Sequence, residues 1–132
     1  MGSELTRAGD AKTLSVLQQK DLGELMQPLI REIHLFDSYA AGTTHLKDPS
    51  VLDAVRPGDT LTLRREDNRF DDNAILLLAG DGRKLGYVPE KDNVVFARLM
   101  DAGKILKAKV RDIQKREGGF RLISIGIYLI DL

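Results

Sequence analysis

Cysteine and tryptophan are absent from this chain, and histidine occurs only twice in its 132 residues. Without cysteine there can be no disulfides, no thiolate metal sites and no thiol nucleophile. His34 and His45 stand in no recognisable Ser/His/Asp setting, so the sequence gives no support to a catalytic triad. No glycine-rich loop ends in Gly-Lys-Ser or Gly-Lys-Thr, which argues against nucleotide hydrolysis. We therefore expect a binding protein, not an enzyme, and no cofactor.

Long apolar runs are missing as well. No segment approaches the roughly 18 apolar residues that a membrane-spanning helix needs, so we expect no membrane partner. The N-terminal residues also lack the basic stretch and apolar run of a secretory signal, and we expect a cytoplasmic protein.

An overall excess of charge of one sign is absent too, because 20 basic side chains balance 20 acidic ones. The two signs are unevenly distributed along the chain, however. Residues 104–121 carry seven Lys or Arg against two Asp or Glu, a net charge of +5. A polyanion responds to such a local field rather than to the charge of the whole protein.

Alternating apolar and polar residues predict a mainly β, β-rich α+β fold. The expected strands are residues 32–38, 60–64, 74–79, 84–88, 105–113 and 120–130. A helix is expected between the fourth and fifth strands, capped by Asp92 or Asn93 and stopped by Gly103. Short antiparallel strands at this spacing favour a small closed or nearly closed barrel.

A second helix is expected near the N-terminus, over residues 11–27. We therefore divide the chain into a helical appendage, residues 1–30, and a barrel domain, residues 31–132. The core-facing stripe of the later helix is expected to be Val95, Phe96, Leu99 and Met100. Strand 105–113 is expected to bury one face and to expose the other, because side chains alternate along a strand. The two faces are Leu106, Ala108 and Val110, and Lys107, Lys109 and Arg111.

The loop Arg64–Ile75 combines three arginines, four carboxylates and one phenylalanine. Phe70 at its centre either covers the core or waits for a ligand. The carboxylates suggest a metal site, but an EF-hand loop beginning at Asp67 would put Arg69 at a ligand position and Leu78 at the final glutamate. Asp and Asn commonly bond their own backbone in turns, so we prefer a turn to a metal site.

Nucleic-acid binding fits these residues better. Small barrels bind single strands by stacking bases on exposed aromatic rings while basic side chains follow the backbone. Tyr39, Phe70 and Tyr87 all lie at expected strand ends or turns, and the lysine face of strand 105–113 offers a track for phosphates. Solvated lysines and core-covering aromatics would give the same pattern, so the residues alone leave both interpretations open.

Five stretches, in order, resemble the HIRAN domain family and together span most of residues 32–130. They are Phe36–Gly42, Pro57–Glu66, Asn68–Ile75, Asp81–Pro89 and Ala97–Lys104. HIRAN domains occur as small standalone bacterial proteins and as modules fused to helicase-type remodelling ATPases. The resemblance implies a modified OB-like, six-stranded β-barrel, which agrees with the pattern of elements above.

The resemblance also implies recognition of the free 3′ end of single-stranded DNA, in DNA repair or processing. By motif, Tyr39 and Phe70 match stacking aromatic residues. Asp71 matches a carboxylate that contacts the 3′-hydroxyl, and Asn68 matches a polar neighbour in the same loop. The DNA-contact candidates are Tyr39, Asn68, Phe70, Asp71, Tyr87, Arg65, Lys91, Lys107 and Lys109.

The chain departs from a characterised family member at three positions. Ser38 stands where that member has an arginine, Tyr87 replaces a histidine, and Glu90 falls near a lysine position with Lys91 adjacent. Arg65 and the lysines of strand 105–113 are the candidates to compensate. A helicase or a nuclease is the expected protein partner. Two alternatives remain: a protein-interaction module that uses helix 11–27, and a metal-dependent nuclease built on the carboxylate loop.

Overall fold

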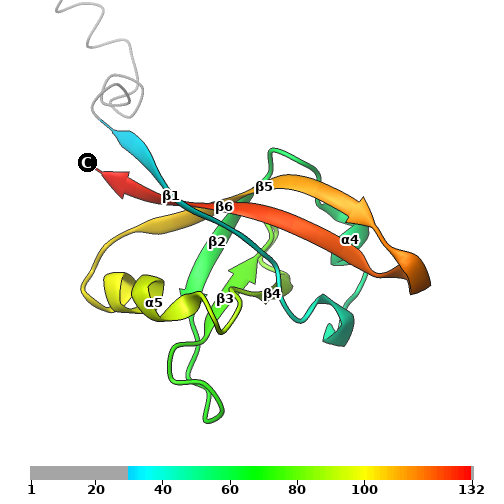
Figure 1. Cartoon of the computed structure of the whole chain (residues 1–132), viewed down its shortest axis with the longest axis horizontal. Helices are drawn as coiled ribbons and strands as arrows, with labels where there is room; N and C mark the ends of the chain where they lie inside the picture. Colours follow the sequence, from blue (N-terminus) through cyan, green and yellow to red (C-terminus); the bar gives the residue numbers. More distant parts are fainter. Residues whose placement is uncertain (1–29, 132) are drawn as a thin grey trace, which may run out of the picture. The chain divides into compact units, whose positions relative to one another are not determined.

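Six strands form a single sheet in the computed structural model, which describes residues 30–131 (Figure 1). Their order across the sheet is β1-β6-β5-β2-β3-β4. The strands are β1 (Arg31–Tyr39), β2 (Thr60–Arg65), β3 (Ile75–Leu78), β4 (Lys84–Tyr87), β5 (Leu106–Lys115) and β6 (Arg121–Asp131). The predicted fold, mainly β and OB-like with six strands, is confirmed.

The core lies against the inner face of this sheet. On β2, Leu61 and Leu63 are buried while the threonines beside them are exposed. On β5 the predicted alternation is confirmed, with the apolar residues buried and the lysines between them on the outer face. All four residues of β3 are buried, as the continuous apolar run Ala74–Ala79 predicts for a strand covered on both faces.

The two outer strands of the sheet meet at one point. Ala41, just after β1, and Tyr87, at the end of β4, exchange two backbone hydrogen bonds of 2.8 and 2.9 Å. Gly86 permits this approach, because a Cβ there would lie 2.5 Å from the carbonyl oxygen of Ala41. A single bridge, not a continuous ladder, therefore joins β1 to β4, and the barrel is nearly closed.

The predicted helix between β4 and β5 is α5 (Asn93–Asp101). It ends before Gly103, whose φ of +91° is the left-handed conformation that favours glycine after a helix. The prediction that Val95 faces the core is wrong, since that side chain is 63% exposed. The buried residues of α5 are Asn93, Phe96 and Ala97. Their spacing of three and four residues defines a face from which Val95 points away.

Three short elements complete the described part of the chain: η2 (Thr43–His45), α4 (Val51–Ala54) and η3 (Glu117–Gly119). The last falls in a predicted turn, whereas the first two were not predicted, because three or four residues are too short to show a periodic pattern. Within residues 30–131, no helix is long and apolar enough to span a membrane. The predicted helix 11–27 lies outside these residues, so the boundary between residues 1–30 and 31–132 stays a prediction.

Candidate nucleic-acid interface

The loop between β2 and β3, residues 66–74, holds its own backbone through side-chain hydrogen bonds. Asn68 Oδ1 accepts the backbone N–H of Phe70 at 2.8 Å. Asp71 Oδ1 accepts the backbone N–H of Asn73 at 2.9 Å. Each is the local contact that Asn and Asp make in turns, which agrees with the turn interpretation of these residues. Among the described residues, no group of three or more His, Asp or Glu side chains is arranged to hold a metal ion.

Phe70 projects from the tip of this loop and is 81% exposed. It therefore does not cover the core, which was one of the two roles that the sequence left open. The guanidinium carbon of Arg69 lies 4.8 Å from the centre of the ring. An exposed aromatic ring beside a cation is the arrangement that receives a nucleobase in single-strand binding proteins.

Asp71, next to Phe70, is half-buried and has a partner in α5. Its Oδ2 accepts a hydrogen bond of 2.8 Å from Nδ2 of Asn93. Each carboxylate oxygen thus takes one hydrogen bond from the protein, at a position where the backbone is already fixed. Because an ionised carboxylate has about four acceptor sites, further acceptor capacity is left for a ligand.

Tyr87 connects β4 to the same loop. Its hydroxyl donates to Oε1 of Glu66 at 2.7 Å, and the same oxygen accepts Nδ2 of Asn68 at 3.1 Å. Nζ of Lys84 lies 3.0 Å from the Tyr87 hydroxyl oxygen and 4.2 Å from the centre of the ring. Tyr87 and Asn68 are therefore brought together through Glu66, a residue that the sequence analysis did not single out.

Tyr39 and Lys91 form another part of the site, at the end of β1 and just before α5. Nζ of Lys91 lies 5.5 Å from the centre of the Tyr39 ring and also pairs with Asp92 at 3.1 Å. The carboxylate of Asp92 accepts the Ser38 hydroxyl at 2.9 Å. Asp92 is the N-cap by position, but it makes no side-chain capping hydrogen bond. It links β1 to the start of α5 instead.

Arg65 stabilises the loop through hydrogen bonds from its guanidinium. Its guanidinium donates to the carbonyl oxygens of Ala74 and Asp72 at 2.6 and 2.7 Å, and its Nε donates to Asp101 at 2.9 Å. The hydrogen bond from Arg65 favours the charged carboxylate and holds the pKa of Asp101 below its usual value. With these three partner residues Arg65 joins the two flanks of the loop to α5, and its donors are largely used within the protein.

Lys107 and Lys109 lie on the outer face of β5 and both pair with Glu32 of β1, Lys109 at 2.6 Å. Hydrogen bonds from Lys107 and then Lys109 lower the pKa of Glu32. Hydrogen bonding to Glu32 likewise raises the pKa of Lys109. Glu32 therefore brings these two lysines close to each other. Within residues 30–131, no hydrogen bond or ion pair joins them to the loop, so they do not extend the cluster around Phe70.

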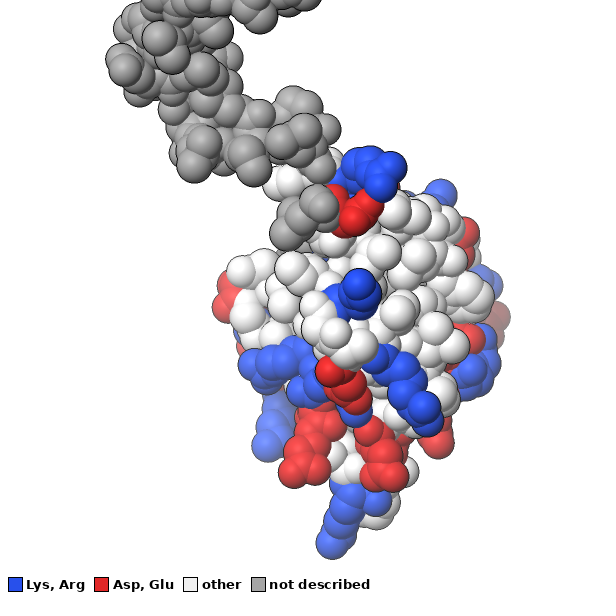
Figure 2. Space-filling view, turned by 90° about the vertical axis from the view of Figure 1, so that its left-hand side faces the viewer, with Lys and Arg blue, Asp and Glu red and all other residues white. Residues whose placement is uncertain are grey.

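Charged residues of both signs lie in and beside the loop. Figure 2 views the left-hand side of Figure 1, and side chains of both signs gather at its lower end, below a surface with few charges. A hollow of about 240 Å³ beside the loop is lined by Arg65, Glu66, Asp67, Asn68, Asp72 and Asp101. Four of these six residues are acidic, so the hollow itself does not suit a phosphate.

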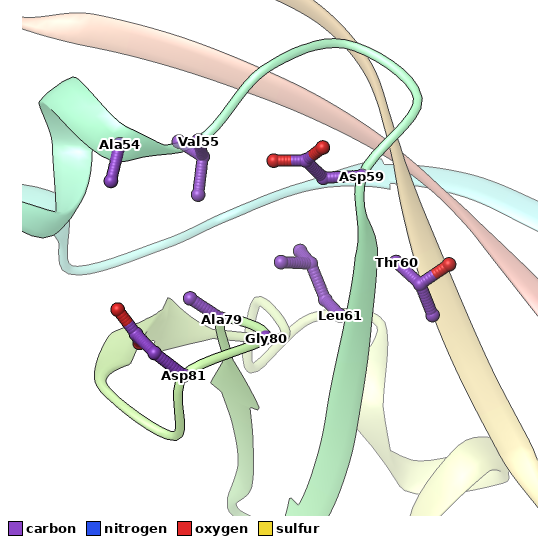
Figure 3. Close-up of a pocket in the computed structure, with 8 residues that line it drawn as sticks. All are labelled: Ala54, Val55, Asp59, Thr60, Leu61, Ala79, Gly80 and Asp81. Carbon is purple, nitrogen blue, oxygen red and sulfur yellow. The ribbon is translucent and has the colours of Figure 1, made fainter.

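The cavity in Figure 3 does not suit a polyanion. It has a volume of about 320 Å³ and is lined by Ala54, Val55, Asp59, Thr60, Leu61, Ala79, Gly80 and Asp81. Its charged groups are two carboxylates, those of Asp59 and Asp81. Both accept hydrogen bonds from nearby backbone N–H groups, of Arg56 and Arg83, and so stabilise turns.

Asn93 and Glu66 are two members of the site that the sequence did not assign to it. Asn93 was considered only as a helix cap, although a buried asparagine in an apolar stripe is unusual. Glu66 was counted among the loop carboxylates without a partner. Both contacts join residues more than 20 positions apart, Asn93 with Asp71 and Tyr87 with Glu66, and local patterns do not reveal such pairs.

Comparisons with known proteins agree with this fold. The family model described as HIRAN domain matches residues 33–126. A protein of known structure from Lactobacillus plantarum is 26% identical, with a TM-score of 0.71 over 78% of this chain and 99% of that chain. The HIRAN domain of human HLTF is 16% identical, with a TM-score of 0.59 over 75% of this chain and 78% of that chain, and supports the fold alone. No protein with curated annotation gives a significant match.

Proposed function

Because this chain belongs to the HIRAN domain family, we propose that it binds single-stranded DNA and recognises a free 3′ end. The observation that carries the proposal is the exposed ring of Phe70 beside the carboxylate of Asp71. Both lie on a loop whose backbone is fixed by its own side chains. A fixed, exposed ring can stack on a base without first being ordered, which lowers the entropic cost of binding.

Phe70 and Tyr39 would stack on bases, and the cations beside them would meet phosphates. Arg69 lies against the ring of Phe70, and its guanidinium would leave the opposite face of that ring for a base. Lys91, whose side chain is 65% exposed, lies beside Tyr39. It would supply the positive charge that an arginine provides in the family member where this chain has Ser38. These two pairs combine stacking with charge, as single-strand binding proteins do.

Asp71 and Asn68 would read the end of the strand. A 3′-hydroxyl can donate a hydrogen bond to the free acceptor sites of the Asp71 carboxylate. A 3′-phosphate carries negative charge and would be repelled by that carboxylate. The pair therefore supports preference for a free 3′-hydroxyl over a phosphorylated or blocked end.

The preference is tested by titrating the protein against 5′-labelled oligonucleotides that end in a 3′-hydroxyl or a 3′-phosphate. We expect the hydroxyl form to bind about tenfold more tightly or better, because a hydrogen bond to a charged group contributes about 1.5–3 kcal/mol. Affinity for both strands should fall as salt rises, since phosphate contacts release counterions. Equal affinity for the two ends, or no binding at low salt, would contradict the proposal.

In this proposal the protein is a non-enzymatic module that works in DNA repair or processing. It would deliver or hold a strand end for a helicase or a nuclease. Family members fused to helicase-type ATPases support such a division of labour, since the fused motor supplies the chemistry there.

A protein-binding role is the second candidate. Val94 and Val95 of α5 are 44% and 63% exposed. A hollow of about 450 Å³ beside them is lined by Leu35, Phe36, Lys91, Asp92, Val95, Phe96 and Leu99. An apolar hollow rimmed by charged groups is typical of a protein contact. Val95→Glu, which places a charge at this hollow and lies outside the DNA-contact candidates, separates the two candidates: loss of a partner in a pull-down, with DNA affinity unchanged, would favour the protein-binding role.

A further inference from the structure

Asn93 is an exception among the buried side chains. Within residues 30–131 only Thr43 and Asn93 are buried polar residues, and Asn93 is 1% exposed. It begins α5 and faces the interior, where Phe96 and Ala97 continue the same face. From there its Nδ2 reaches across to Asp71, 22 residues away, at 2.8 Å.

The chemistry of the pair fixes how the amide is turned. Both oxygens of an ionised Asp71 only accept hydrogen bonds, so Asn93 can meet them only with its NH₂ group. Its Oδ1 then points elsewhere, and among the described residues it is the one buried side-chain polar atom without a hydrogen-bond partner. An unpartnered buried oxygen destabilises the folded state. A leucine at this position would avoid that penalty, so stability alone does not explain an asparagine here.

We propose that Asn93 is a positioning residue that orients the Asp71 carboxylate to read a free 3′-hydroxyl. The inference rests on the proposed function and names a specificity-determining residue outside the loop. Asn73 N–H holds Asp71 Oδ1 at 2.9 Å, and Asn93 Nδ2 holds Oδ2 at 2.8 Å. Two donors on opposite oxygens fix the rotation of the carboxylate, and one of them comes from a helix rather than from the loop itself.

The residues beside Asn93 extend this role to the other part of the site. Asp92, whose side chain is 10% exposed, pairs with Lys91 and accepts the Ser38 hydroxyl. Lys91 in turn lies beside the ring of Tyr39. Three consecutive residues therefore set the position of Tyr39 relative to Asp71. The start of α5 would thus set the distance between a base stacked on Tyr39 and a 3′ terminus bound at Asp71.

The test is the ratio of affinities for 3′-hydroxyl and 3′-phosphate strands, measured together with the melting temperature of the full chain. In Asn93→Leu the hydrogen bond and the unpartnered oxygen are both lost. We expect its ratio to fall about tenfold while its melting temperature is unchanged or higher. In Asn93→Ala the same hydrogen bond and the same unpartnered oxygen are lost without a new charge, and the ratio should fall as far.

Two further variants calibrate the result. Asp71→Asn removes the carboxylate proposed to recognise the 3′-hydroxyl, so it should show the lowest ratio of 3′-hydroxyl to 3′-phosphate affinity. Arg98→Gln changes an exposed residue of the same helix and should leave the ratio as it is in the unmodified protein. If leucine does not fit at position 93, the smaller Asn93→Ala carries the same comparison.

The outcomes separate the inference from the proposed function. A ratio that is lost in Asp71→Asn but retained in a folded Asn93→Leu or Asn93→Ala would overturn the role of Asn93 and leave the proposed function standing. A lower melting temperature with an unchanged ratio would do the same, because it marks a purely structural residue. No preference for the 3′-hydroxyl in the unmodified protein would overturn the proposed function itself.

Discussion

Single residues in and beside the loop 66–74 have one of two roles: some stabilise its conformation, and others are exposed at its surface. Arg65 ties both flanks of the loop to the protein with its guanidinium, and Asn68 caps the turn before Phe70. Phe70 itself makes little contact with the core, since most of its surface is exposed. A large apolar ring on a fixed turn has no stabilising role that would explain it, and this distinguishes it from the aromatic residues that pack, such as Phe96.

Replacing Phe70 with leucine tests the stacking role. Leucine keeps an apolar side chain but has no π-face, and base stacking contributes roughly 1–3 kcal/mol per base. We expect affinity for single-stranded DNA to fall by about 5-fold to 150-fold, while Phe70→Tyr, which keeps the ring, binds nearly as well. Because the residue is exposed, neither change should shift the free energy of unfolding by more than about 0.5 kcal/mol. Equal binding by the leucine and tyrosine variants would contradict stacking.

At the scale of elements, α5 and the end of β4 give the site its framework. Residues 91–93, at and just before the start of α5, contact both β1 and the loop. Gly86 lets β4 approach the chain after β1. The backbone atoms of Ala41 and Tyr87 can meet only because position 86 has no side chain. Gly86 is therefore a packing residue of the barrel, and its effect reaches Tyr87 at the site.

A methyl group at Gly86 should open this junction. Gly86→Ala would place Cβ 2.5 Å from the Ala41 carbonyl oxygen, so the backbone must move. We expect the free energy of unfolding to fall by about 1–3 kcal/mol, the usual effect of overpacking. Gly80→Ala is the matched control, because a Cβ there meets nothing within 4 Å and the backbone needs no left-handed φ. Urea unfolding compares the two, and equal midpoints would refute the role of Gly86.

Sequence patterns predict most of these elements, because alternation and helical spacing are local. The buried faces of β2 and β5 follow directly from a period of two, and Gly103 marks the end of α5. The predicted stripe was right at Phe96, Leu99 and Met100, which lie in or pack against the core, but it began at Val95, whereas the buried face of α5 begins at Asn93. An asparagine was not expected to lead a buried face, so the pattern favoured the valine.

At the scale of the whole molecule, the candidate site lies where the two ends of the sheet meet. Tyr39 belongs to β1, Tyr87 to β4, and the loop 66–74 joins β2 to β3. The sequence identified Phe70, Asp71 and Asn68 because they share one loop. It could not show that Asp71 bonds α5, or that Lys107 and Lys109 share the carboxylate of Glu32, because those contacts depend on which elements become neighbours in the fold.

The bridge between Ala41 and Tyr87 has a consequence for how the protein would respond to DNA. A junction held by two hydrogen bonds is a point where the barrel can open locally, and such openings are visible as amide hydrogen exchange. A strand stacked on Tyr39 and anchored at the loop would favour the closed form. At a DNA concentration of 100 times Kd, opening would become harder by about 2.7 kcal/mol, so exchange at these two amides should slow by about 100-fold.

The amide of Ala79, which bonds the Arg83 carbonyl in the β3–β4 hairpin, serves as the internal reference and should exchange at its original rate. Uniform slowing of all three amides would indicate general stabilisation instead. If only the amides of the bridge are protected, DNA binds preferentially to the closed form of the barrel, and DNA binding and local opening are thermodynamically linked.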